Sequence, residues 1–412
     1  MKWTLTGSPM VTKVNFREAS PDDKTTVRNI LIYAFEGHRN RYGDPEEKRD
    51  LELPYQIVDY LLEDENGDII ATLGVIEFNQ RIRGTWVKMA GITAVACRPE
   101  YRRKSYMTRL FLNAFVQLNQ QEFLVSVLYP FTFAFYEKLG YGQADEILTH
   151  TIKTTEIIKR PTPNRMITED FDPNFKRCQP LYRKLSEKLE GLVERPPYVW
   201  EKLYGWNWTN GGFQFICQDL EGNDLGYIIT RFERKSPFNP FSFLEVREIV
   251  YFDSETKQAL LNFLADHDSQ REYIKIAPYD QNYLPFLKTP RMKENYLIAN
   301  SMLRIINIES LVPLLKYPEE VSTSVTLELK DPHCSWQNKT LTVQIENGRG
   351  IITTTPSDEK LLLGVKELSQ VVVGFRSPQE LAEAGAIKGS QEALERLGKI
   401  FPKQTTYFRD YF

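Results

Sequence analysis

Three consecutive cations, Arg102-Arg103-Lys104, directly precede a predicted helix and could bind an anion. The first backbone N–H groups of a helix have no partner within the helix, and the helix dipole places partial positive charge at the same end. Together with three cationic side chains, these groups suit a phosphate, and a diphosphate in particular. The alternative is that the three residues form an ordinary solvated turn. The elements on either side favour the anion site.

A strand before the cations and a helix after them would hold this turn in place. Small and β-branched residues from Ile92 to Cys97 predict the strand, which ends before Pro99 because proline cannot donate to a sheet ladder. Apolar residues at three- and four-residue steps predict one buried stripe of a helix that begins at about Lys104. The stripe consists of Met107, Leu110, Phe111, Ala114, Phe115 and Leu118.

A second strand and helix follow. Residues 123–130 have the apolar character of a buried strand and lead into Phe133-Ala134-Phe135-Tyr136-Glu137-Lys138-Leu139-Gly140-Tyr141. Strand, basic turn, helix, strand and this motif, in that order, resemble the acyl-CoA-binding half of the GNAT acetyltransferase superfamily. The chain length, the aromatic C-terminal residues 407–412 and the residues of these segments resemble one branch of the superfamily. This branch is the enhanced-intracellular-survival (Eis-like) N-acetyltransferases. The resemblance covers most of the chain.

The resemblance implies a mixed α/β fold. Two tandem GNAT domains, each a mostly antiparallel sheet flanked by helices, would precede a sterol-carrier-like α/β domain. We expect the first at residues 1–152, the second, degenerate one at 153–295, and the third, which carries the catalytic C-terminus, at 296–412. Rising polarity and proline content near residues 151–175 favour the first boundary. The resemblance also implies a homo-hexamer.

The resemblance further implies which residues hold the co-substrate, acetyl-CoA. The strand edge at Val95, Ala96 and Cys97 would pair with the pantetheine arm. Phe131 and Thr132 would add a further contact. The turn and the first helical residues would surround the pyrophosphate; they are Arg102, Arg103, Lys104, Ser105, Tyr106, Met107 and Thr108.

Acyl transfer to an amine needs an acid for the leaving thiolate and a base for the amine proton. In the resembled family these are a tyrosine, matched by Tyr136, and the C-terminal carboxylate, which here belongs to Phe412. A phenol with a pKa of about 10 is protonated at neutral pH. A carboxylate of pKa about 3.5 is a weaker base than an alkylamine by about 7 pKa units, or about 9 kcal/mol. Proton abstraction therefore requires desolvation, a water relay or capture of the neutral amine. The alternative for Tyr136 is a half-buried structural aromatic.

One departure from the family pattern lies in the phosphate turn. Ser105 stands where the family usually has glycine, and Met107 stands where most of the superfamily has a small residue. Glycine permits the closest backbone approach to a phosphate. Ser105 would either restrict that approach or add a contact through its hydroxyl, so the departure concerns acetyl-CoA affinity more than the fold.

Composition excludes several classes of protein. A net charge of −3 leaves no general basic surface for nucleic acid. No apolar run approaches the roughly 18–20 residues of a membrane span, and the first residues lack the apolar core of a secretory signal. The four cysteines stand singly, and the four histidines are not in ligand spacing. We therefore expect no metal, no disulfide framework and a cytoplasmic location.

The rest of the chain repeats familiar patterns. In the second unit, a strand-turn-helix segment has Asp253-Ser254-Glu255 where the first has cations, so we expect it to bind no cofactor. The third unit reads as four strands between residues 324 and 364, followed by two short helices that open at Ser377 and Ser390. The aromatic tail is expected to dock, because exposing Phe408, Tyr411 and Phe412 would forgo roughly 1.5–3 kcal/mol each.

These patterns predict an acetyl-CoA-dependent N-acetyltransferase. Its acceptor would be a primary amine of a cationic small molecule, aminoglycoside-like or a polyamine, or a lysine side chain. Asp410 and Glu36 are candidates to attract a polycation, unless they are solvated carboxylates. The alternative is a catalytically weak protein that binds CoA or lipid as a signal, which Ser105 and the third unit favour.

Overall fold

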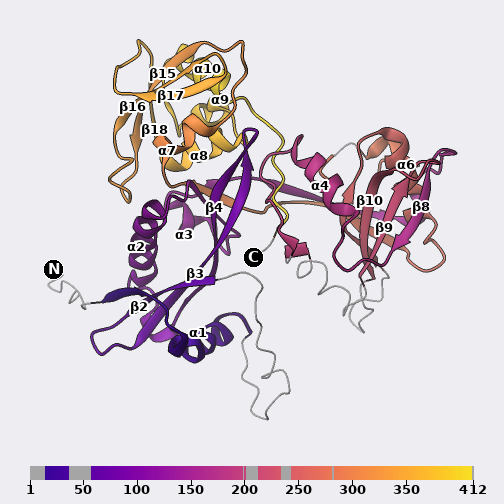
Figure 1. Cartoon of the computed structure of the whole chain (residues 1–412), viewed down its shortest axis with the longest axis horizontal. Coiled ribbons are helices and arrows are strands. Elements are labelled where there is room, and N and C mark those ends of the chain that lie inside the picture. The colour runs from indigo at the N-terminus through magenta and orange to yellow at the C-terminus, as the bar shows by residue number, and fades with distance from the viewer. Residues whose placement is uncertain are drawn as a thin grey trace, which may run out of the picture.

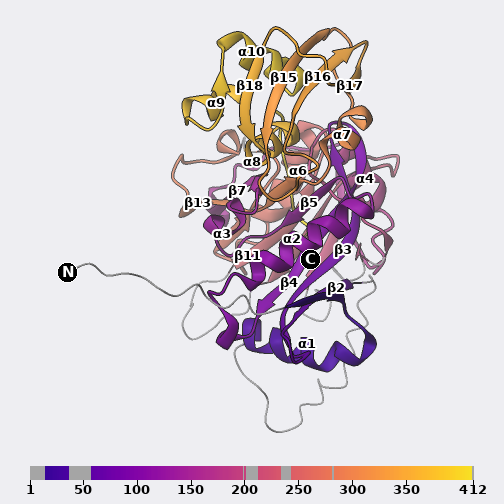
Figure 2. The same ribbon diagram turned by 90° about the vertical axis from the view of Figure 1, so that its left-hand side faces the viewer.

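A computed structural model describes residues 14–36, 57–197, 199–200, 212–232, 243–280 and 283–410. Three β-sheets with flanking helices form three bodies, coloured in chain order from indigo through magenta and orange to yellow (Figure 1). Figure 2 shows the third body above the first. The predicted mixed α/β fold is confirmed.

The first sheet contains the strand that precedes the basic turn, and the helix that follows the turn packs on it. Strands β1 to β4 pair as antiparallel neighbours, and β5 lies parallel to β4 after the crossover through α2. The predicted apolar stripe of α2 is buried against this sheet, although the helix begins at Tyr106, slightly later than expected. The elements are β1 (Asn15–Glu18), α1 (Lys24–Leu31), β2 (Ile57–Glu63), β3 (Ile69–Ile82), β4 (Thr85–Cys97), α2 (Tyr106–Gln120), β5 (Val125–Leu128), α3 (Phe133–Glu137), β6 (Gly142–Gln143) and β14 (Met302–Ile305).

The second sheet is built from the same order of elements: a hairpin, a strand and a helix. β9 and β10 pair as antiparallel neighbours, and α6 covers one face of the sheet with buried Leu260, Leu261 and Leu264. Four of its strands, β7, β8, β12 and β13, were not predicted. The elements are β7 (Glu146–Lys153), β8 (Met166–Asp170), α4 (Cys178–Ser186), β9 (Gly212–Gln218), β10 (Asp224–Phe232), β11 (Phe243–Val250), α6 (Ser254–Ala265), β12 (Tyr273–Ile276) and β13 (Glu294–Ala299).

The third sheet has the four predicted strands and a short fifth one. The two predicted terminal helices are present, and Ser377 forms the expected capping box with Glu380. A buried helix before them, α8, was not predicted. The elements are α7 (Ile308–Leu311), β15 (Thr323–Lys330), β16 (Thr340–Glu346), β17 (Arg349–Thr353), β18 (Lys360–Gly364), α8 (Val365–Val373), α9 (Pro378–Glu383), β19 (Lys388–Gly389) and α10 (Gln391–Ile400). Short helical turns lie at η1 (Pro21–Asp23), η2 (Ile32–Glu36), η4 (Pro99–Tyr101), η5 (Thr154–Glu156), η6 (Leu284–Phe286) and η7 (Val312–Leu314).

The sheets exchange strands across the predicted boundaries. β7, placed by the sequence in the first domain, pairs with β12 and β13 of the second sheet. β14, placed in the third domain, lies between β5 and β6 of the first sheet. The boundaries at residues 152 and 295 therefore do not coincide with the sheets, and the division into 1–152, 153–295 and 296–412 stays a prediction.

Candidate active site

The last residues of β4 have one unpaired edge. β4 pairs with β5 only as far as Gly91, while its other edge stays paired with β3 up to Cys97. An extra residue on β4 breaks the register with β3 near Ala94, which has φ of 51°. Such a bulge increases the local twist and turns the strand away from its neighbour. Val95, Ala96 and Cys97 thus present backbone groups that no described strand pairs on the β5 side.

The basic turn connects this strand to α2 through left-handed backbone. Arg103 and Ser105 both have φ of 61°, and α2 begins at the next residue. The turn is not covered by other side chains, since the residues from Arg102 to Ser105 are all exposed. Its exposed cations and the first N–H groups of α2, which have no acceptor within the helix, suit a diphosphate.

Two of the three cations are directed by neighbouring groups. Arg102 donates from Nε to the carbonyl oxygen of Cys97 at 3.2 Å, and its guanidinium lies 5.6 Å from the centre of the Tyr33 ring. Lys104 Nζ lies 5.5 Å from the centre of the Tyr101 ring. Arg102 therefore braces the end of the strand, which the sequence did not predict. Arg103 and Lys104 are the better candidates to contact a phosphate.

These features fit acetyl-CoA as a substrate. The free edge of β4 offers alternating donors and acceptors to an amide-bearing arm, and the turn offers N–H groups and positive charge to a pyrophosphate. Phe131 is 73% exposed beside Thr132, next to this region. Met107 and Thr108 are half-buried in the first turn of α2. The assignment of individual contacts to these residues stays a prediction.

Replacing Ser105 by glycine should stabilise the protein by about 1 kcal/mol, because a residue with a Cβ pays roughly that amount in left-handed backbone. Ser105 forms no side-chain cap to α2, so little is lost with its hydroxyl. Chemical denaturation and calorimetric titration with CoA measure the stability and the affinity. A large gain in affinity would show that the serine impairs binding.

The matched control is Ser390→Gly. Ser390 has φ of −74°, and its Oγ accepts a hydrogen bond from the backbone N–H of Ala393 at 3.0 Å. Glycine there removes a working cap and should lower stability by a few tenths of a kcal/mol, about the usual effect of this exchange. If both serine-to-glycine changes alter the free energy of unfolding equally, the backbone at Ser105 is not strained.

Tyr136 lies on α3 within a cluster of aromatic rings. Its ring centre is 5.0 Å from that of Phe135, 5.3 Å from that of Phe131 and 6.0 Å from that of Phe111. The residue is 3% exposed, and burial raises the pKa of the phenol because it disfavours the charged phenolate. The phenol is therefore protonated throughout the neutral pH range, as a proton donor must be.

The C-terminal tail runs between the first and second bodies, as the yellow trace of Figure 1 shows. The N–H of Tyr407 donates to the carbonyl oxygen of Glu190 at 2.8 Å. The ring of Phe408 packs on Gly191, where an added Cβ would lie 2.2 Å from it and where φ is 88°. Phe408 is 1% exposed, so its predicted docking is confirmed. Tyr411 and Phe412 lie outside the described residues.

Side chains of both sheets fix the backbone of this tail. Asn300 donates from Nδ2 to the carbonyl oxygen of Phe408 at 2.7 Å, and the N–H of Phe408 donates to Asp145 Oδ2 at 3.2 Å. Tyr129, which follows β5, donates from its hydroxyl to the carbonyl oxygen of Asp410 at 2.7 Å. Asp410, the last described residue, is thus held by Tyr129 at the end of β5. Tyr129 itself is seven positions before Tyr136 in the chain.

Arg195 holds the side chain of Asp410 inside the protein. Its Nε lies 2.5 Å from Asp410 Oδ1, and its two terminal nitrogens donate to Glu248 at 3.1 and 3.0 Å. The hydroxyl of Tyr182 donates to Asp410 Oδ2 at 3.0 Å. The side chains of the three charged residues are at most 3% exposed. Burial raises the pKa of Asp410, and the positive charge of Arg195 opposes this rise.

The expectation that Asp410 attracts a polycation or is solvated is therefore wrong. Its carboxylate is committed to a buried cation and anchors the tail. The side chain of the other candidate, Glu36, lies outside the described residues.

The matching turn of the second unit has partners of its own. Asp253 Oδ1 accepts a hydrogen bond from the N–H of Thr256 at 2.8 Å and caps α6. Arg165 lies 3.2 Å from Asp253 and 3.3 Å from Glu255. The carboxylates thus occupy the helix terminus that would otherwise receive an anion, consistent with the expectation that this unit binds no nucleotide, which stays a prediction.

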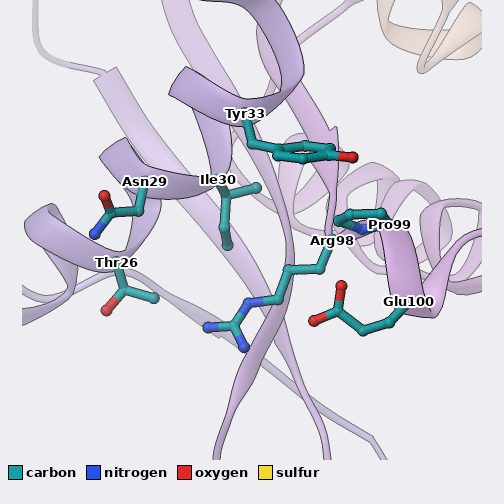
Figure 3. A pocket seen from close by; sticks show the side chains of 7 residues that line it. All are labelled: Thr26, Asn29, Ile30, Tyr33, Arg98, Pro99 and Glu100. Atoms are coloured by element: carbon teal, nitrogen blue, oxygen red, sulfur yellow. The ribbon is translucent and has the colours of Figure 1, made fainter. Parts of the chain in front are cut away.

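A cavity of about 430 Å³ opens beside the basic turn. Thr26, Asn29 and Ile30 of α1, with Tyr33, face Arg98 and Glu100 across it (Figure 3). One cation and one carboxylate line it. In the sequence, Arg98 and Glu100 look like ordinary turn residues, and no motif marks them as part of a site.

None of the helices in the described part of the chain combines the length and apolarity of a membrane crossing. Within the same residues, no three His, Cys, Asp or Glu side chains gather as metal ligands would. All four cysteines are buried free thiols.

Comparison with known families bears out the resemblance. Residues 15–144 and residues 191–305 each match an acetyltransferase (GNAT) domain, and residues 308–409 match a sterol carrier protein domain. An uncharacterized N-acetyltransferase of Streptomyces coelicolor is 22% identical over 336 residues, which cover 77% of this chain and 79% of that protein.

Solved structures share the fold over the whole length. A GCN5-related N-acetyltransferase from Anabaena variabilis has a TM-score of 0.83 and 24% identity, with 97% of this chain and 100% of that chain covered. Eis1 from Mycobacterium abscessus has a TM-score of 0.76 and 18% identity, with the same coverage. At these identities the likeness establishes the fold.

Two GNAT domains and a sterol carrier protein domain in one chain define the class: this is a tandem-GNAT acyltransferase. Within that class, it shares its fold with Eis1 from Mycobacterium abscessus.

The structure brings together the β4 edge, the basic turn and the aromatic cluster of Tyr136, all from residues that the sequence predicted. It also adds residues that the sequence analysis missed. Tyr129, Arg195 and Asn300 fix the tail, but they lie more than a hundred positions from their partners, so no spacing could have indicated them.

Proposed function

We propose that this protein transfers the acetyl group of acetyl-CoA to a primary amine, with Tyr136 as general acid and the C-terminal carboxylate of Phe412 as general base. The acceptor classes expected from the sequence are a cationic small molecule, such as an aminoglycoside or a polyamine, and a lysine side chain. Val95 to Cys97 would hold the pantetheine arm, and the turn from Arg102 to Thr108 the pyrophosphate. Acetyl-CoA supplies the activated thioester.

The proposed reaction balances with these two groups. The amine nitrogen forms a bond to the thioester carbonyl carbon as the carbon–sulfur bond breaks. The amine proton passes to the Phe412 carboxylate, directly or through water, and the departing thiolate takes the phenolic proton of Tyr136. Solvent then removes the proton from Phe412 and returns one to the Tyr136 phenolate, which restores both groups. Burial keeps the phenol protonated before the reaction, as a proton donor requires, and the same rise in its pKa makes it a weaker acid than an exposed phenol.

The observation that carries the proposal is the anchored tail. Asp410 is fixed at the end of β5 by Tyr129 and in the second domain by Arg195. Two residues separate it from the terminal carboxylate, and two residues reach roughly 7 Å when extended. This anchor supports the proposed base, because a terminal carboxylate two residues further on would be tethered near the strand that leads to Tyr136.

Replacing Tyr136 by phenylalanine is expected to lower kcat by about a hundredfold, because the thiolate then leaves without a proton donor. Titration of the thiol released from acetyl-CoA, with a panel of primary amines, measures the rate. CoA affinity should be nearly unchanged, since the ring and its packing are retained.

Phe135→Leu is the control for disturbed packing. The Phe135 ring packs against the Tyr136 ring but has no ionisable proton to donate. Wild-type kcat in the Tyr136→Phe variant would reject the general acid. The absence of thiol release with every amine would reject the enzyme and favour a CoA-binding protein.

We further propose a cytoplasmic homo-hexamer. Four free thiols support a reducing compartment. The edge strand β13 exposes Leu297 and Ile298, at 56% and 46%, which supports contact with another subunit. Light scattering at several protein concentrations determines the number of subunits.

A further inference from the structure

A second cavity, of about 260 Å³, lies between the tail and the face of the second sheet opposite α6. Arg409 and Asp410 of the tail line it on one side. Strands β7, β11, β12 and β13 line it on the other, through residues that include Ile147, Lys275 and Ile298. Asp410, which lines this cavity, is also the residue whose carbonyl oxygen Tyr129 holds at the end of β5. The cavity therefore adjoins the anchored part of the tail.

The charges of this cavity do not suit a polycation. Three cations line it, Arg247, Lys275 and Arg409, against the carboxylates of Glu245 and Asp410. Both carboxylates are already engaged by arginines.

Asp410 is paired with Arg195, as described above. Glu245 accepts hydrogen bonds from Arg231 Nε at 3.1 Å and from Arg247 Nη1 at 3.0 Å. A polycationic acceptor would have to compete with these arginines for each carboxylate, and it would meet the remaining positive charge of the cavity.

Arg247 pairs with Glu245, and the Arg409 guanidinium lies 4.2 Å from the centre of the Tyr407 ring. Lys275 is therefore the candidate cation for an anionic ligand.

Lys275 is half-buried on β12, opposite Glu245 on one neighbouring strand and Thr151 on the other. Among the described residues it forms no ion pair, and its Nζ lies 5.8 Å from the centre of the Tyr296 ring. A half-buried ammonium with this surrounding favours an anionic partner, because solvent screens the attraction less than at an exposed site.

The size of the cavity points the same way. Ligand pockets for drug-sized molecules span roughly 300–1,000 Å³, and this cavity lies below that range. The apolar wall contributed by Ile147 and Ile298 suits a short methylene chain. A compact amine fits better than a molecule of several rings.

We propose that this cavity is the acceptor site and that it takes a compact primary amine carrying its own anionic group, a carboxylate or a phosphate, held by Lys275. This inference rests on the proposed acetyl transfer and replaces the acceptor class expected from the sequence. It selects a small zwitterionic amine over an aminoglycoside or a polyamine.

The test compares amines that differ only in the anion. L-lysine is paired with L-lysinamide, phosphoethanolamine with ethanolamine, and spermidine represents polycations. Calorimetric titration gives the affinity, and thiol release gives kcat/KM. We expect about a tenfold advantage of the anionic member in one pair, as for one charge-assisted hydrogen bond. The pair that shows it identifies the anion as carboxylate or phosphate.

Lys275→Gln should reduce this ratio towards one. Lys388→Gln removes the same charge from an exposed position in the third domain and should keep the wild-type ratio. Equal or tighter binding of the neutral members or of spermidine, no detectable binding of any amine, or a ratio that persists in Lys275→Gln would overturn the inference.

The two measurements separate this inference from the proposed function. A binding preference for the anionic amine without thiol release would reject the enzyme and keep the site. Thiol release without any preference would reject the site and keep the enzyme.

Discussion

Removing Phe412, or extending the chain by a few residues, is expected to lower kcat by about a thousandfold, within the usual range for loss of a general base. In either variant the terminal carboxylate moves away from the place where the tail holds it. Acetyl-CoA should still bind, because the β4 edge and the basic turn lie on other segments. Thiol release measures kcat, and calorimetric titration measures CoA affinity.

Phe412→Leu separates the carboxylate from the side chain. It keeps the chain length and the terminal carboxylate and changes only the side chain, so it should lose far less turnover than the deletion. If the deletion and the extension retain wild-type kcat, the terminal carboxylate is not the base. If the leucine variant loses as much as the deletion, the aromatic ring rather than the carboxylate is essential.

Replacing Arg195 by methionine is expected to destabilise the protein by about 3–5 kcal/mol, the usual cost of breaking a buried ion pair. Asp410 and Glu248 would be left buried without their shared cation. Because Asp410 anchors the tail, kcat should fall as well, while the KM for acetyl-CoA changes little. Denaturant unfolding and thiol-release kinetics measure the two effects.

Two further variants show whether Arg195 acts through the tail. Arg183→Met changes an arginine that is 78% exposed and 3.9 Å from Glu194, so it should alter stability by less than about 1 kcal/mol. Asp410→Asn keeps the pair of Arg195 with Glu248. Its effect on kcat, expressed as an activation free energy, should exceed its effect on the free energy of unfolding. If Asp410→Asn keeps the wild-type kcat, Arg195 is a structural residue only.

The parts of the site built from neighbouring residues could be predicted from the sequence. The stripe from Leu110 to Leu118 fixes α2, and the cations before it mark the turn. Phe408 had to be buried because of its apolar area. Each of these signals depends on local spacing or on hydrophobicity, which a sequence displays directly.

The parts built from distant residues could not be predicted. Arg195 and Asp410 are 215 positions apart, and each by itself reads as a surface charge. β14 reads as any buried strand, and only the pairing shows that it completes the first sheet. The run Val371-Val372-Val373 has the β-branched character of a strand, but it ends α8, because tertiary packing outweighs propensity there.

The exchange of strands has a consequence for biosynthesis. β5 finds its antiparallel neighbour only when Met302 to Ile305 have left the ribosome, after the whole second GNAT domain has been made. Until then the nascent first sheet has an open, apolar edge, the kind of surface through which partly made chains aggregate. Chaperone dependence during translation should therefore be greatest in the interval before residue 305 emerges and should fall once that strand is inserted.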